Sequence, residues 1–222
     1  MLDTKTVIIN FSEDDLLERG MSDMRKVLNN FSNQKKINLS QLIQLNHISS
    51  YYMYSAIFEM NKMLNPNYDE SKGSPLLDSC KDFIDICELL EDPLRIDSIR
   101  SMTDKKRLSA SRVPVTFEDN PTMEQCIADI REILTSFKKH NQASLYDVCI
   151  LSRSCNYLLG NGVLKLFQIL NGSFDDRKQK HPVFNILAEY SMMCEFLLIP
   201  EKAMQDLPEF EDDDSSNVIK FH

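Results

Sequence analysis

The amino-acid sequence predicts a mainly α-helical protein, a bundle of about seven or eight helices around a central hydrophobic helical hairpin, with at most one short β-pair. Glycine and proline are scarce, at 5 and 8 of 222 residues, which favours helices over a turn-rich sandwich. Apolar residues recur at helical spacing along most of the chain. The segment 145–170 is apolar on nearly every face, as is typical of a helical element buried in the centre.

The N-terminal part predicts a short extended segment followed by two helices. Residues 4–11 are β-prone, and a weakened capping box then introduces a helix over about 13–31. The polar segment 33–38 interrupts the helical pattern. Asn38 can cap a second helix, which ends at about Leu64 because an Asn-Pro pair follows.

Three further helix starts share one device, a capping residue followed by proline at the first helical position. They are Ser74-Pro75, Asp92-Pro93 and Asn120-Pro121. We therefore expect helices over 75–91, from 93 to about 102, and over 121–139. The stretch 113–117 is extended, because of its proline and β-branched residues. It is interpreted as an edge strand paired with residues 5–10, or as a loop.

The apolar segment 145–170 is expected to break near its middle. Gly160 and Gly162 are poor helix formers and typical of helix ends, so the sequence predicts two helices, 144–159 and 163–170. These two helices would form the central hairpin on which the others pack.

The C-terminal part predicts one more long helix and a tail. The helix starts at Pro182 and ends before Pro200, whereas residues 209–222 are acidic and expected to be disordered. Residues 1–208 are interpreted as a single helical domain, with a subdomain boundary near 109–120 as the alternative. No internal repeat is convincing by inspection.

Composition and charge exclude some function classes. The formal net charge is -9, and residues 201–222 hold seven of the acids, so bulk attraction to nucleic acid or to an anionic membrane is not expected. Neither a secretory signal nor a run of about 20 apolar residues is visible, which predicts a cytoplasmic protein. The six cysteines are then expected to be reduced and buried.

Motifs for catalysis, metals or cofactors are not found. Cys80 and Cys87 share a predicted helix face but are too far apart to chelate one ion alone, so they are interpreted as core thiols. Any cysteine could meet His47, His140 or His181 in the fold, yet no local signature singles out a nucleophile. The sequence therefore predicts no cofactor and singles out no catalytic residue.

One concentrated positive patch is present. It consists of Lys105, Lys106, Arg107 and Arg112. It is a candidate for binding an anion or an acidic partner, or for directing a basophilic kinase to Ser109 or Ser111. The simpler interpretation is favourable charge at the C-terminal end of a helix.

Tyrosine and methionine exceed what one buried helix face needs, notably at Tyr51, Tyr52 and Tyr54. These residues are candidates for a protein-interaction surface, since amphipathic helices often bind partners through such faces. The favoured function is a non-enzymatic helical interaction, regulatory or adaptor protein, bound to another protein or to itself. The alternative is a subunit of a nucleic-acid-handling complex that contacts phosphates through residues 105–112. The acidic tail could dock on a partner or serve only for solubility.

Overall fold

The computed structural model describes residues 4–11, 15–34, 36–69, 71, 74–91, 113–116, 120–140, 142–170, 172, 174 and 181–198. Within them the chain is mainly helical, as predicted. The helices are α1 (Asp15–Gln34), α2 (Leu39–Leu64), α3 (Pro75–Glu91), α5 (Pro121–His140), α6 (Leu145–Leu170) and α7 (Pro182–Leu198). The strands are β1 (Ile8–Asn10), β2 (Lys36–Asn38), β3 (Pro114–Thr116) and β4 (Gln142–Ser144). The helix predicted from residue 93 and the acidic tail 209–222 lie outside the described residues.

Most helices begin where the sequence places them. Helices α3, α5 and α7 start at Pro75, Pro121 and Pro182, each at the first helical position. Asn38 caps α2 through a capping box. Its side chain accepts a hydrogen bond from the Gln41 N–H at 2.8 Å, and the Gln41 side chain accepts one from the Asn38 N–H at 3.0 Å.

Helix α6 is continuous, so the predicted break at the glycines, and with it the central hairpin, is wrong. A side chain at Gly162 would place its Cβ 2.7 Å from Leu42 Cδ1 and 3.1 Å from Leu39 Cδ1 of α2. Gly162 therefore allows α6 and α2 to approach closely. This packing outweighs the cost of about 1 kcal/mol for each of Gly160 and Gly162 in a helix.

The strands form two antiparallel pairs, where at most one pair was predicted. Residues 114–116 are indeed extended, but they pair with 36–38 and not with residues 5–10. Strand β1 pairs instead with 142–144, a segment interpreted from sequence as part of a polar loop and a helix start. Strands of three residues leave too little pattern to predict a partner.

The order of elements shows an internal repeat that inspection of the sequence missed. Strand β1 begins at residue 8 and β3 at residue 114, and the same offset of 106 residues separates α1 from α5, β2 from β4 and α2 from α6. The paired helices have equal lengths, 20 residues for α1 and α5 and 26 for α2 and α6. Helices α3 and α7 both have 17 residues, at an offset of 107. We call residues 7–91 the first repeat and 113–198 the second repeat.

The two repeats are related by an approximate two-fold axis, because each supplies a strand to the other. Strand β1 of the first repeat pairs with β4 of the second, and β3 of the second pairs with β2 of the first. The registers are equivalent: Ile9 is opposite Ala143, and Val115 is opposite Ile37. Such reciprocal contacts are the mark of an isologous interface.

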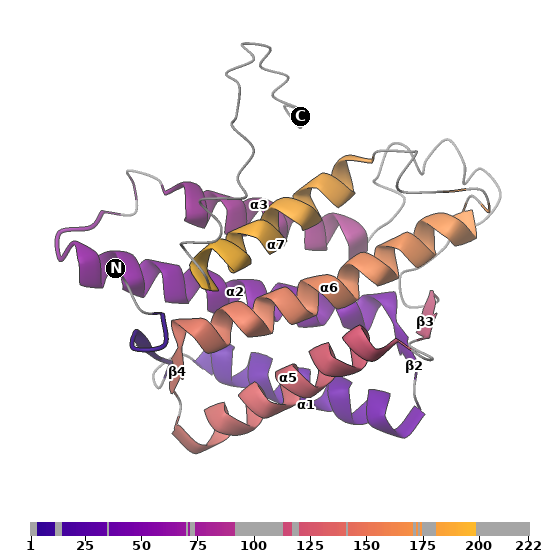
Figure 1. Ribbon diagram of the computed structural model, residues 1–222, viewed down its shortest axis with the longest axis horizontal. Coiled ribbons are helices and arrows are strands. Elements are labelled where there is room, and N and C mark those ends of the chain that lie inside the picture. The colour runs from indigo at the N-terminus through magenta and orange to yellow at the C-terminus, as the bar shows by residue number, and fades with distance from the viewer. Residues whose placement is uncertain are drawn as a thin grey trace, which may run out of the picture.

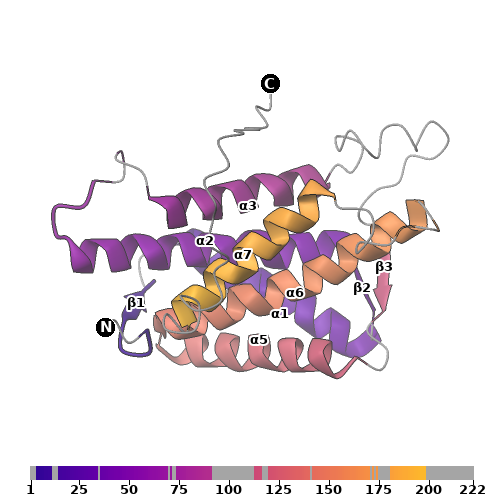
Figure 2. The ribbon, with the colours of Figure 1, turned by 45° about the horizontal axis from the view of Figure 1, so that its top comes forward.

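The helices lie in three tiers, each of which contains one helix from each repeat (Figures 1 and 2). Helices α1 and α5 cross in one outer tier, α2 and α6 form the middle tier, and α3 and α7 form the other. The two strand pairs lie on opposite sides of this stack, near the ends of the helices (Figures 1 and 2). Among the elements that the structure describes, α2 and α6 make the most extensive contact, so the core is centred where the repeats meet.

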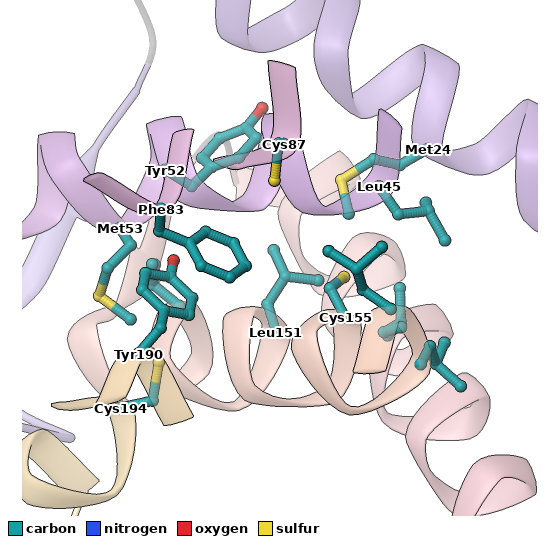
Figure 3. Packing of buried hydrophobic residues seen from close by; sticks show 14 of the residues in the cluster. Met24, Leu45, Tyr52, Met53, Phe83, Cys87, Leu151, Cys155, Tyr190 and Cys194 are labelled. Atoms are coloured by element: carbon teal, nitrogen blue, oxygen red, sulfur yellow. The ribbon is translucent and has the colours of Figure 1, made fainter. Parts of the chain in front are cut away.

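The axis passes close to two aromatic rings. Phe83 in α3 and Tyr190 in α7 hold equivalent positions, and their rings stack at 3.7 Å between centroids with planes 7° apart. Figure 3 shows them face to face, next to Met53 and Cys194. Both side chains are fully buried. Each repeat therefore completes the core of the other with the same element.

Candidate functional site

A groove lies in the first repeat between strand β1, the start of α1 and the C-terminal half of α2. Its volume is about 330 Å³. It is lined by Ile9, Asn10, Phe11, Leu17, Tyr54, Ser55, Phe58 and Glu59. We call it the first groove. Its floor is apolar and aromatic, while its charge comes from Glu59.

A second groove occurs in the second repeat, with a volume of about 210 Å³. It is lined by Val115, Asn120, Met123, Asn161, Leu164, Lys165 and Gln168. The two grooves are equivalent under the two-fold axis. The matching pairs are Ile9/Val115, Leu17/Met123, Ser55/Asn161, Phe58/Leu164 and Glu59/Lys165.

The grooves have diverged in charge and in aromatic content. Glu59 in the first groove corresponds to Lys165 in the second, so the charge at the equivalent position is reversed. Tyr54 corresponds to Gly160, which leaves open space around its backbone. The two grooves are thus formed by equivalent elements but differ in charge and in aromatic lining.

Two lysine side chains lie close to aromatic rings of the first groove. The Lys62 Nζ lies 4.1 Å from the centre of the Phe58 ring and 3.3 Å from a Glu59 carboxylate oxygen. The Lys81 Nζ of α3 lies 5.6 Å from the Tyr54 ring. Cation–π contacts at exposed sites contribute only about 0.5–1 kcal/mol. They help to orient the Phe58 and Tyr54 rings.

Large apolar residues are exposed at equivalent places in the two repeats. Tyr51 of α2 and Tyr157 of α6 are 49% and 38% exposed, and Met63 and Ile169 are 55% and 44% exposed. Single exposed hydrophobic residues need no explanation. Here they recur at equivalent positions of α2 and α6, so each repeat exposes the same two apolar positions.

The three tyrosines singled out from the sequence occupy different environments. Tyr51 is exposed beside His47, and Tyr54 lines the first groove. Tyr52 is a core residue: its hydroxyl donates to the Leu17 carbonyl, and its ring packs edge-on against Phe11 and Phe137. Only Tyr51 and Tyr54 are therefore placed to touch a partner.

The other groove residues were missed by sequence reasoning. Phe58 and Leu164 looked like ordinary helix residues, because a partly buried position cannot be told from a core position by spacing alone. A comparison of the chain with itself at an offset of 106 residues would have aligned Tyr51 with Tyr157 and revealed the paired surface. The basic candidates Lys105, Lys106, Arg107 and Arg112 lie outside the described residues, so their role stays a prediction.

The cysteines are buried thiols in the core. All six are unpaired, and burial raises the pKa of every one, to about 12 for Cys80 and Cys155. A thiol with a raised pKa is a poor nucleophile and a poor metal ligand. Among the described residues, no cluster of histidines, cysteines and carboxylates is arranged to hold a metal ion.

The histidine side chains in the described part of the chain pack against aromatic rings. His47 packs on the Tyr51 ring, and His181 packs on Phe167 beside the start of α7. Partial burial lowers the pKa of His181. Its Nδ1 accepts a hydrogen bond from the Val183 N–H, which makes His181 a helix cap.

No helix in the described part of the chain has the length and apolarity that a membrane crossing requires. The chain matches no protein-family model, no curated protein and no solved structure.

Proposed function

We propose that this chain is a non-enzymatic protein-interaction or adaptor module that contacts partners through the first and second grooves. The observation that supports this most strongly is the recurrence of an exposed tyrosine beside each groove, Tyr51 and Tyr157, at equivalent positions of α2 and α6. An exposed aromatic residue next to an apolar depression is a frequent anchor in protein interfaces.

The chemistry of the grooves also favours binding over catalysis. The residues that line them include neither cysteine nor histidine, and the buried thiols elsewhere are held protonated by their surroundings. An active site would be expected to bring a nucleophile and a base within hydrogen-bond reach. The grooves instead combine apolar floors with one charge each.

A site-specific crosslinking experiment tests the proposal. A photoreactive phenylalanine analogue is introduced at position 51, 157 or 88 of the full chain, and crosslinks are collected in the native host. Glu88 is the control, because it is exposed on α3, away from both grooves. We expect discrete protein adducts from positions 51 and 157 and none from position 88.

Binding should then depend on the grooves themselves. Phe58→Ala in the first groove and Leu164→Ala in the second remove one partly buried apolar side chain each. We expect each substitution to reduce the adducts of its own repeat at least about tenfold, which corresponds to an anchor of about 1.4 kcal/mol. Equal adducts at all three positions, or a strictly monomeric chain with no adducts, would contradict the proposed function.

A further inference from the structure

We infer that the surface where the two repeats meet is a dimer interface contained in one chain, so that a repeat can make the same contacts with the complementary repeat of a second copy. The partner that this surface fits is therefore another molecule of the same protein. The inference is independent of what the two grooves bind.

The first support is the exchange of main-chain hydrogen bonds. The Leu39 N–H donates to the Val113 carbonyl at 3.0 Å, and the Leu145 N–H donates to the Val7 carbonyl at 2.8 Å. Leu39 and Leu145 are equivalent residues, as are Val7 and Val113. Each repeat thus positions the start of the other's longest helix, in the way that two subunits of a symmetric dimer do.

The second support is the N-terminal cap of α2 and of α6. Each cap directly follows a strand, β2 or β4, that pairs with a strand of the other repeat. Asn38 and Gln41 form the capping box of α2. At the equivalent positions in α6, the Asp147 N–H donates to the Ser144 hydroxyl at 3.0 Å, and the Ser144 N–H donates to the Asp147 carboxylate at 3.3 Å. The same local device is therefore kept in both repeats, although the side chains differ.

The third support is that the buried residues of the two repeats form one shared hydrophobic core, and not two separate cores in contact. Helices α2 and α6 bury Leu45 and Leu151 completely, and the stacked pair Phe83 and Tyr190 comes from one repeat each. Interfaces this apolar are typical of obligate subunit contacts. A single repeat would leave this surface open to water.

The covalent link between the repeats runs from Glu91 to Val113. It raises the effective concentration of one repeat around the other, which favours pairing within a chain. The contacts themselves are the same whether the two repeats belong to one chain or to two. When pairing within a chain is blocked, pairing between chains should replace it, as in domain swapping.

Trans-complementation of full-length chains tests this directly. Leu45→Asp places a charge in the core of the first repeat, and Leu151→Asp does the same at the equivalent position of the second. Each variant alone is expected to be unfolded or insoluble. Co-expressed with different tags, the two should yield a soluble complex in which the intact second repeat of one chain pairs with the intact first repeat of the other.

The control pair joins two chains that both carry Leu45→Asp, and it has no intact first repeat to offer. We expect tandem purification to recover at least about tenfold more complex from the complementary pair than from this control, with a mass of two chains by light scattering. Soluble complex recovered in equal amounts from both pairs would overturn the inference.

A circular permutant keeps the inference testable if both aspartate variants fold too poorly to be rescued. Joining His222 to Met1 and opening the chain between residues 109 and 110 retains every residue and reverses the order of the repeats. Because the repeats are equivalent, we expect a helical monomer that unfolds at the temperature of the parent chain. A permutant that does not fold would contradict the two-fold equivalence on which the inference depends.

Discussion

Asn46 and Ser152 occupy equivalent positions in α2 and α6, and each donates a hydrogen bond to a backbone carbonyl of the other helix. The Asn46 Nδ2 donates to the Cys155 carbonyl at 2.8 Å, and the Ser152 Oγ donates to the Ser49 carbonyl at 3.1 Å. Cys155 and Ser49 are themselves equivalent, so the two bonds are related by the two-fold axis. They fix the register of α2 against α6 in the apolar centre of the molecule.

Removing either donor should destabilise the fold. Asn46→Ala removes the hydrogen bond to the Cys155 carbonyl, and Ser152→Ala removes the one to the Ser49 carbonyl. Each substitution should lower the free energy of unfolding by about 0.5–1.5 kcal/mol. Urea unfolding followed by far-UV circular dichroism measures both. Gln44→Ala, at an exposed position of the same helix, is the control and should change stability by less than about 0.5 kcal/mol. Equal effects at positions 44 and 46 would contradict this role.

Two glycines of α6 should respond in opposite directions to alanine. At Gly160 nothing lies within 4 Å of an added Cβ, so Gly160→Ala should stabilise the protein by about 0.5–1 kcal/mol through helix propensity. At Gly162 the Cβ would lie 2.7 Å from the Leu42 side chain, so overpacking should cost about 1–3 kcal/mol. Thermal unfolding of both variants checks the prediction. A stabilising Gly162→Ala would mean that α2 and α6 are packed less closely than described.

His181 should make the start of α7 sensitive to acid. Desolvation lowers its pKa below the ordinary value of 6.5, so the unfolded chain binds the proton more readily than the folded one. Its contribution to stability is therefore present above pH 6.5 and is lost as the pH falls through the lowered pKa. Protonation of Nδ1 would also remove the acceptor for the Val183 N–H.

The variant His181→Asn separates this effect from the titration of carboxylates, because asparagine can cap the helix without titrating. Urea unfolding of both proteins at about pH 5.5 and about pH 7.5 gives the comparison. The loss of stability on acidification should be smaller in the variant. An identical loss in both proteins would show that His181 does not contribute.

Thiol reagents should distinguish Cys126 from the other cysteines. It is only partly buried, whereas Cys80, Cys87, Cys149, Cys155 and Cys194 are fully buried. In the folded protein at neutral pH we expect one slowly reacting thiol, since burial raises even the pKa of Cys126. Cys126→Ser should abolish this reaction, and all six thiols of the parent chain should react in denaturant. Rapid labelling of a second cysteine would indicate local opening of the core.

Leu166→Asp should unfold the protein and not merely disable one activity. The Leu166 side chain is fully buried in α6, and a carboxylate there would lose its hydration without gaining a partner. Gln168→Asp, two residues later at an exposed position that lines the second groove, is the matched control. Far-UV circular dichroism should show loss of helix for the first variant alone. A folded, soluble Leu166→Asp protein would refute the central position of α6.

The local signals in the sequence predicted the helices well. Capping residues and helix-start prolines act within one turn, so Asn38, Pro75, Pro121 and Pro182 mark boundaries whatever the rest of the chain does. Gly162 misled the prediction, because its helical conformation is maintained by α2, a segment more than 100 residues away in the sequence.

The repeat and the paired grooves could not be read from local patterns. Core positions need an apolar side chain of suitable volume but no particular residue, so Met24 can correspond to Ile130 and Met53 to Leu159 without visible similarity. The equivalence becomes visible only when the element boundaries and strand partners are known. For the same reason Tyr52 could not be separated from Tyr51 and Tyr54 before its contacts with Phe11 and Phe137 were seen.

The stack of Phe83 on Tyr190 has a consequence for how the two halves can vary. A homodimer must present one and the same residue on both sides of its axis, so every substitution there is made twice. In one continuous chain the two equivalent positions can change independently. A substitution on one side of the axis can then be compensated by a different substitution on the other side. Gly20 of α1 contacts Ile48 of α2, and the equivalent contact in the second repeat joins Cys126 of α5 to Ser154 of α6. The larger side chain of the pair is on α2 in the first repeat but on α5 in the second. Such asymmetric exchanges let two surfaces on one scaffold specialise separately while the interior stays complementary.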